Sequence, residues 1–130
     1  MTRADVQRWL DRYVAAWKSY DEAEITDLFS ADAEYRYHPW DEPVRGREAI
    51  VRDWIEPTGD ASTRDEPGTY EAAYQPWAID GDRAVAVGTS DYFTDATRAM
   101  RAQRFHNVYL LEFDAGGRCR SFTEWFIQER

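Results

Sequence analysis

The chain has 130 residues, a mass of 15.2 kDa and a formal charge of −9 at pH 7. Hydrophobic residues make up 43% of the sequence and aromatic residues 15%, which excludes a disordered chain and is enough for one domain with a single core. The excess of acidic residues argues against nucleic acid or a membrane surface as a partner, because both attract clustered Lys and Arg.

The N-terminal half of the sequence predicts three helices and one short strand. Apolar residues recur at spacings of three and four from Val6 to Trp17, which predicts an amphipathic helix. Thr2 with Asp5 predicts a capping box at the start of this helix. The other expected elements are a helix over residues 21–29, a strand over residues 33–38 and a helix over residues 47–55.

The C-terminal half predicts four strands in two hairpins. The turn Asp80-Gly81-Asp82 separates the first two strands, and residues 114–117, which include two glycines, separate the last two. Helices followed by antiparallel strands predict an α+β fold in one domain over residues 1–130, with the helices packed on one face of the sheet. The expected strands are residues 69–79, 83–93, 105–113 and 118–127, and the expected loops are residues 58–68 and 95–101.

Three segments carry a resemblance to a known superfamily. They are residues 29–39 (FSADAEYRYHP), residues 46–50 (GREAI) and residues 109–126 (YLLEFDAGGRCRSFTEWF). With the order of the predicted elements, they make nearly the whole chain resemble the nuclear transport factor 2-like (NTF2-like) superfamily, and most of all its SnoaL-like branch. The resemblance implies an α+β cone, in which a strongly curved antiparallel or mixed sheet and three N-terminal helices enclose an apolar pocket. It also implies a homodimer, since members commonly pair through the outer face of the sheet.

A comparison with the ketosteroid isomerases of this superfamily implies three site residues. Tyr13 falls on their oxyanion-stabilising tyrosine, His38 on their catalytic base, and Tyr109 on a second oxyanion donor; the last two positions are Asp in those enzymes. Histidine suits general-base work near neutral pH, and a phenol can donate a hydrogen bond to a developing oxyanion. Each residue also has a structural alternative: His38 could cap the strand, and the tyrosines could be core aromatics.

Arg36 and Glu124 are predicted to share the same pocket. If the strand over residues 33–38 is regular, its period of two places Arg36 on the same face as His38. A buried Arg36 needs a partner, and Glu124, which the resemblance places in the pocket, is the expected one. The pair would be either a structural ion pair or a water-activating group, as in the epoxide hydrolases of this superfamily.

Three further polar residues are candidates: Asp41 and Glu42, just past the end of the predicted strand, and His106. Asp41 and Glu42 are interpreted as solvated loop carboxylates, with orientation of His38 as the alternative, and the parity of His106 directs it away from the pocket. The wall of the pocket is expected from aromatic residues that could equally be plain core: Trp17, Trp54, Phe105, Phe122 and Phe126.

No metal ion or cofactor is predicted. The two histidines lie far apart, and the sequence has no paired cysteines, no HExxH motif and no phosphate-binding glycine motif. Cys119 is the one cysteine, interpreted as a buried thiol in a strand, and the sequence begins without an apolar signal region. These features predict a cytoplasmic protein.

The sequence therefore favours a cofactor-free enzyme that acts on a hydrophobic, carbonyl-bearing or cyclic small molecule. The expected reaction is isomerisation, aldol-type cyclisation or dehydration, in which His38 moves a proton while Tyr13 and Tyr109 stabilise charge on oxygen. Hydrolysis of an epoxide-like ring by Arg36 and Glu124 is a variant. The rival hypothesis is a non-catalytic module that binds a small ligand or only dimerises. An open pocket that holds both His38 and Tyr13 favours the enzyme, and a pocket plugged by Trp and Phe side chains favours the module.

Overall fold

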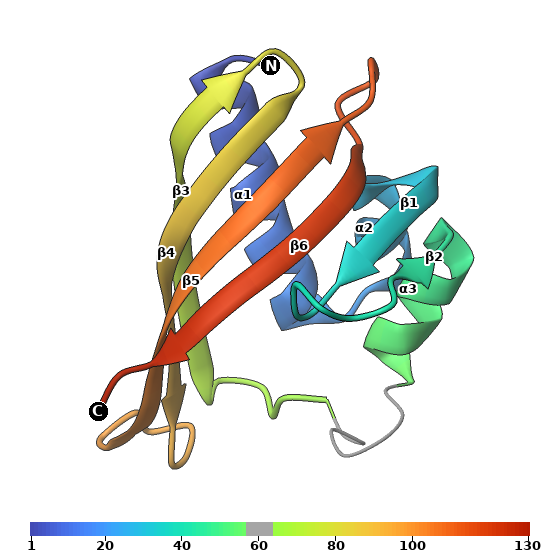
Figure 1. The fold of residues 1–130 in the computed structure, drawn as a ribbon. Coiled ribbons are helices and arrows are strands. Elements are labelled where there is room, and N and C mark those ends of the chain that lie inside the picture. The colour runs from blue at the N-terminus through green and yellow to red at the C-terminus, as the bar shows by residue number, and fades with distance from the viewer. Residues whose placement is uncertain (57–63) are drawn as a thin grey trace.

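The computed structural model describes residues 1–56 and 64–130, and it confirms the predicted α+β architecture (Figure 1). Three helices precede most of a six-stranded mixed sheet. The helices are α1 (Arg3–Ser19), α2 (Glu22–Leu28) and α3 (Arg47–Ile55). The strands are β1 (Phe29–Arg36), β2 (Val44–Arg45), β3 (Tyr70–Asp80), β4 (Arg83–Phe93), β5 (Arg101–Phe113) and β6 (Cys119–Gln128).

The strands follow the order β2-β1-β6-β5-β4-β3 across the sheet. β1 is parallel to β6, and every other neighbouring pair is antiparallel. Figure 1 shows the long strands β3 to β6 twisting past α1, while α2 and α3 gather with β1 and β2 on one side. The sheet is open rather than closed, so its concave face is free to form one wall of a cavity that the helices complete.

α1 follows directly from local sequence chemistry. The side chain of Thr2 accepts a hydrogen bond from the backbone of Asp5, and the carboxylate of Asp5 accepts one from the backbone of Thr2, so the predicted capping box is present. One face of the helix is buried, and from this face Trp9 donates a hydrogen bond to the carbonyl of Leu28, 3.0 Å away. Tyr13 lies on the same buried face, so the helix delivers its side chain to the interior.

The first strand differs from its prediction at both ends. β1 begins at Phe29, immediately after α2, and ends at Arg36 rather than at His38. Pairing with β6 fixes this register: Tyr35 lies opposite Phe122, and Arg36 lies opposite Thr123. The strand stops there because the chain turns over the next residues, where the backbone of Asp41 donates a hydrogen bond to the carbonyl of His38.

Two other elements extend beyond what local pattern could indicate. β2 has only two residues, and it exists because they pair with Glu34 and Tyr35 of β1. β5 begins at Arg101, inside the predicted loop over residues 95–101, because pairing with β4 continues to that end. Most of the predicted loop over residues 58–68 lies outside the described residues. In the described part of the chain, no helix has the length and apolar character needed to cross a membrane.

One glycine allows β3 and β4 to approach closely. A Cβ atom built on Gly88 would lie 2.1 Å from the carbonyl oxygen of Ala73 and 2.8 Å from the Cα atom of Tyr74. Any side chain at this position would therefore push the two strands apart. The close approach keeps Tyr74 in place on the inner face of the sheet, where it faces the cavity described below.

Candidate active site

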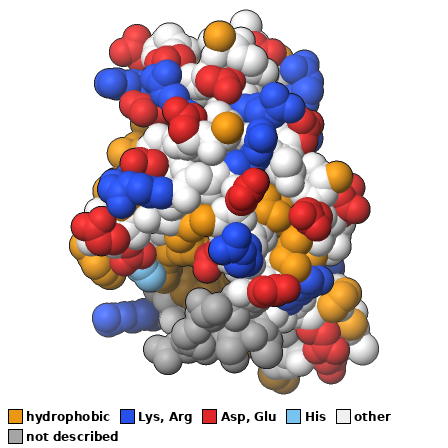
Figure 2. Space-filling view, turned by 90° about the vertical axis from the view of Figure 1, so that its right-hand side faces the viewer, with side chains coloured by type: hydrophobic (Ala, Val, Ile, Leu, Met, Phe, Trp, Pro, Cys, Tyr) orange, Lys and Arg blue, Asp and Glu red, His pale blue; other side chains and the backbone are white. Residues whose placement is uncertain are grey.

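A cavity of about 670 Å³ opens between the helices and the inner face of the sheet. Its wall is mainly aromatic, and Figure 2 shows hydrophobic side chains in a hollow with charged side chains along part of its rim. The tyrosines and other aromatic residues of the wall come from α1, α3, β1 and all four long strands. Such a volume and lining suit a small apolar molecule.

Glu124 places a carboxyl group in this aromatic cavity. It lies on β6 two residues from Phe122 and two from Phe126, so strand alternation directs it to the inner face. Asn107 of β5 donates a hydrogen bond from Nδ2 to its Oε2 atom, 2.8 Å away, and Glu124 forms no ion pair with any Arg or Lys of the described residues. Burial raises the pKa of Glu124 to about 7, although Asn107, Tyr109 and His38 act to lower it.

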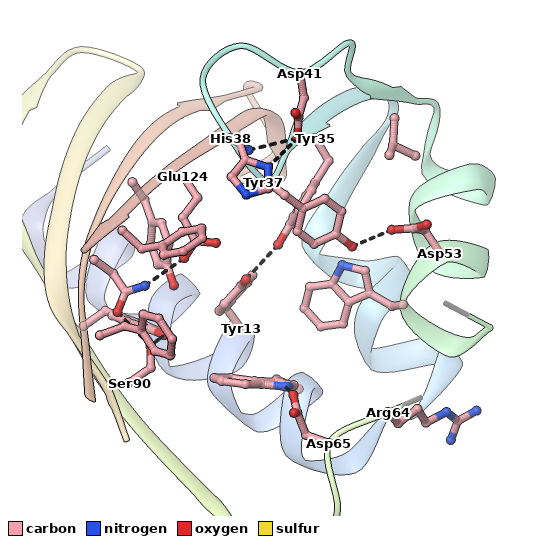
Figure 3. Close-up of a pocket in the computed structure, with 18 of the residues that line it drawn as sticks. Tyr13, Tyr35, Tyr37, His38, Asp41, Asp53, Arg64, Asp65, Ser90 and Glu124 are labelled. Atoms are coloured by element: carbon pink, nitrogen blue, oxygen red, sulfur yellow. Dashed lines mark hydrogen bonds and ion pairs between the residues drawn. The ribbon is translucent and has the colours of Figure 1, made fainter. Parts of the chain in front are cut away.

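His38 lies at the mouth of the same cavity, where the chain turns after β1 (Figure 3). Its Nδ1 atom is 2.9 Å from Oδ2 of Asp41, which also accepts a hydrogen bond from the backbone of His38. The interpretation of Asp41 as a solvated carboxylate was therefore wrong, and the alternative holds: Asp41 orients the imidazole. Since Nδ1 is engaged, Nε2 is the ring nitrogen available to a ligand. The ring of His38 stacks on that of Trp40, with 4.9 Å between their centroids.

Tyr13 and Tyr35 form a buried pair of phenols deeper in the cavity. Their hydroxyl oxygens are 2.8 Å apart (Figure 3), and burial raises the pKa of both groups well above the usual value. Sequence reasoning selected Tyr13 and missed Tyr35. The missed signal was the sequence Tyr35-Arg36-Tyr37, because aromatic residues on both sides of a charged one indicate that the aromatic side chains face the interior.

Arg36 does not lie on the face of β1 that the sequence predicts. Its guanidinium lies 3.6 Å from the carboxylate of Glu34, on the opposite face of β1 from Tyr35, and it does not line the cavity. The predicted ion pair between Arg36 and Glu124 is therefore absent. Counting by twos back from His38 failed because β1 ends at Arg36, and the turn carries His38 to the cavity independently of strand alternation.

Tyr109 and four of the five predicted wall residues line the cavity. Tyr109 is 2% exposed, and Trp17, Trp54, Phe105 and Phe126 contribute to the wall. Phe122 instead lies behind the wall, fully buried, with its ring centroid 4.2 Å from that of Tyr35. This position makes Phe122 a packing residue rather than a ligand contact.

Two polar groups outside the prediction also belong to the wall. Tyr37 donates a hydrogen bond to Asp53 of α3 over 2.5 Å, and Trp17 donates one to Asp65 over 3.0 Å. His106 lies outside the cavity, as its parity predicts, and its Nε2 atom is 3.0 Å from the carboxylate of Glu129. Among residues 1–56 and 64–130, no three His, Cys, Asp or Glu side chains are grouped to hold a metal ion.

A model of the SnoaL-like domain matches residues 10–122 of the sequence. The chain belongs to the SnoaL-like family. The structure of a LEH-like epoxide hydrolase from M. tuberculosis resembles this SnoaL-like protein with a TM-score of 0.65, over 96% of this chain and 84% of that chain. The two sequences are 14% identical, so the likeness concerns the fold alone, which is the α+β cone of the NTF2-like superfamily. No curated protein matches the chain.

Proposed function

We propose that this SnoaL-like protein is a cofactor-free enzyme that moves a proton on an apolar small molecule bearing a carbonyl group. The observation that carries the proposal is Glu124, a carboxyl group with a pKa of about 7 in an aromatic cavity. A general base works best when its pKa lies near the working pH, because it is then both available and strong. A solvated glutamate, with its ordinary pKa of 4.5, would be about 300-fold weaker as a base.

The proposed step removes a proton next to the carbonyl carbon. The Glu124 carboxylate accepts this proton, the C–H electron pair forms a carbon–carbon double bond, and the carbonyl oxygen becomes an enolate oxygen. Within the phenol pair, one O–H group is used between Tyr13 and Tyr35, and the other O–H is left to donate to that oxygen. Return of the proton to another carbon gives isomerisation, loss of a β-hydroxyl gives dehydration, and attack on a second carbonyl gives cyclisation.

His38 and Asp41 supply a second ionisable site at the mouth of the cavity. Asp41 fixes the ring through Nδ1, so Nε2 can accept or return a proton on the solvent side of the ligand. This arrangement supports different roles for the two residues. Glu124 abstracts the proton from carbon, and His38 assists at a leaving or attacking oxygen. Arg36 has no part in it, since its partner is Glu34.

A simple exchange reaction tests the proposal without knowledge of the natural substrate. The α-protons of 2-tetralone, an aromatic cyclic ketone, exchange with D₂O when a base removes them, and proton NMR follows the loss of signal. We expect the protein to accelerate this exchange and Glu124→Gln to lower the acceleration about 10²- to 10⁴-fold. Glu112→Gln is the matched control, because Glu112 lies outside the cavity and pairs with Arg83.

The alternative function is binding of a small ligand without catalysis, which the continuous aromatic wall would also support. Calorimetry with 2-naphthol, which has a similar size but no exchangeable carbon site next to a carbonyl, measures binding separately. Binding of 2-naphthol together with equal exchange rates for the wild type, Glu124→Gln and buffer would favour this alternative and refute the enzyme.

We further propose that the chain forms a homodimer in the cytoplasm through the outer face of β5 and β6. Four apolar side chains are exposed there: Val108, Leu110, Trp125 and Ile127. Val108 lies directly opposite Trp125 in the sheet, so the four side chains form one patch. We expect a dimer in analytical ultracentrifugation and a monomer after Trp125→Glu, while a monomeric wild type at micromolar concentration would contradict the proposal.

A further inference from the structure

Four polar side chains form a chain of contacts across the inner face of the sheet. Tyr74 of β3 lies 2.8 Å from Ser90 of β4, Ser90 lies 2.7 Å from Asn107 of β5, and Asn107 lies 2.8 Å from Glu124 of β6. Tyr74, Ser90 and Asn107 are each no more than 5% exposed. Buried polar groups are costly unless they are hydrogen-bonded, so a chain of this length in an aromatic wall requires an explanation.

The donors of this chain all point toward Glu124. The hydroxyl hydrogen of Ser90 is directed to Oδ1 of Asn107, so Ser90 can only accept the hydrogen bond that joins it to Tyr74. Because Oδ1 of Asn107 is an acceptor, its amide nitrogen is the group that faces Glu124, and Nδ2 donates to Oε2. Each group thereby fixes the orientation of the next, and the chain ends on Oε2 of Glu124.

We propose that Asn107, held in orientation by Ser90, is a positioning residue that fixes Oε2 of Glu124 as an acceptor and leaves Oε1 as the oxygen that exchanges a proton with the ligand. An amide nitrogen neither takes up nor releases a proton at neutral pH, so no proton can pass to Glu124 through Asn107. We therefore assign the exchanged proton to Oε1, the carboxylate oxygen that Asn107 does not contact. This inference rests on the proposed role of Glu124 and adds which atom reacts and what holds it.

The surroundings of Glu124 make its ionisation a usable readout. The titratable groups that interact with it are the imidazole of His38 and six phenols, those of Tyr13, Tyr35, Tyr37, Tyr74, Tyr92 and Tyr109. Burial raises the pKa of each of these phenols, so they stay neutral between about pH 5 and pH 9. The imidazole of His38 also acts on Glu124, so the variants below are measured with and without His38→Gln to separate its contribution.

The test is a carbon-13 NMR titration of the Glu124 carboxyl in protein labelled at glutamate, with the signal assigned by its loss in Glu124→Gln. Asn107→Leu keeps the approximate size but removes the donor to the ionised form, so the titration midpoint should rise by about one pH unit, which is tenfold in the acid dissociation constant. Ser90→Ala should raise it less, because Asn107 remains but can turn. Thr89→Val is the matched control, since Thr89 is the neighbour of Ser90 on the outer face of β4, and should leave the midpoint unchanged.

A second variant keeps the test decisive if Asn107→Leu does not fold. Asn107→Asp preserves the shape and replaces the donor by an acceptor, so two carboxyl groups should share one proton and titrate in two separated steps. The pH profile of 2-tetralone exchange should shift to higher pH in the same way, because the rate depends on the fraction of the reacting carboxyl group that is ionised. If Asn107 served only in packing, its replacement would lower the free energy of unfolding but would change neither the titration midpoint nor the pH profile of exchange.

The outcomes separate this inference from the function on which it rests. A raised midpoint together with a raised pH profile supports the positioning role. An unchanged midpoint in Asn107→Leu, or a raised midpoint with an unchanged pH profile, overturns it even if Glu124→Gln abolishes exchange. If Glu124→Gln leaves exchange unchanged, the proposed function itself fails, whatever the titration of Asn107 variants shows.

Discussion

Glu124 should make the folded protein less stable as the pH rises from about 5 to 8. Its pKa is raised by burial from 4.5 to about 7 in the folded chain, while an unfolded glutamate keeps the ordinary value. Between these two values the folded state binds more protons than the unfolded state, so the free energy of unfolding falls with increasing pH. The stabilising contribution is complete below about pH 4.5 and is lost as the pH rises through about 7.

The size of this effect follows from the shift itself. A pKa raised to about 7 corresponds to a cost of about 3 kcal/mol for the ionised form, of which about 2 to 3 kcal/mol develops between about pH 5 and pH 8. Glutamine has the shape of the protonated side chain and cannot ionise. Glu124→Gln should therefore match the wild type near pH 5 and be more stable by about 2 to 3 kcal/mol near pH 8.

Urea unfolding followed by circular dichroism at several pH values measures this difference. Both proteins are also measured with His38→Gln, because His38 interacts with Glu124, and the difference between the two curves in that background isolates Glu124. Glu112→Gln is again the control, because its carboxylate lies outside the cavity beside Arg83. Curves for Glu124→Gln and the wild type that stay parallel from about pH 5 to pH 8 would refute the reasoning.

Three further predictions concern packing and buried hydrogen bonds, and urea unfolding checks each of them. Tyr13→Phe and Tyr35→Phe should each cost about 1 to 3 kcal/mol because the remaining hydroxyl loses its partner, and the double variant should cost less than the sum; additive values would show that the two phenols do not interact. Phe122→Ala should lower the free energy of unfolding by about 3 to 5 kcal/mol, since this ring is fully buried. Trp40→Ala should change it by about 0.5 kcal/mol or less, because the Trp40 side chain is 79% exposed. Equal effects of the two substitutions would contradict this difference in burial. Gly88→Ala should destabilise by about 3 kcal/mol or more, because the new methyl group meets the backbone of β3 at 2.1 Å, and wild-type stability would show that the two strands are not so close.

Much of the fold could be predicted from local pattern. The spacing of apolar residues in α1, its capping box, and the glycine-containing turns of the two hairpins depend only on neighbours in sequence, and the structure has all of them. Elements whose existence depends on a distant partner were missed or misplaced. β2 is a pair of residues that pairs with β1, and Arg101, Gln103 and Arg104 at the start of β5 pair with the end of β4.

The candidate site shows the same division at the level of single residues. Tyr13, His38 and Glu124 could be selected from sequence, because the resemblance and the chemistry of their side chains both pointed to them. Arg36 was assigned to the wrong face because His38 was counted as part of β1, whereas His38 lies in the turn after the strand and its direction does not follow the alternation of β1. Asn107 gave no signal of its own, because nothing in the residues beside it marks a partner on the next strand.

The sequence by itself determined the helices, the long strands and the aromatic content of the interior, because these depend on local periodicity and on the burial of apolar surface. Only the tertiary structure decided which polar groups meet. Tyr13 and Tyr35 are 22 residues apart in sequence, and Asn107 and Glu124 are 17 apart, yet each pair is joined by a hydrogen bond of 2.8 Å. Strand register and the placement of α1 on the sheet set such distances, and they also set the burial that raises the pKa of Glu124.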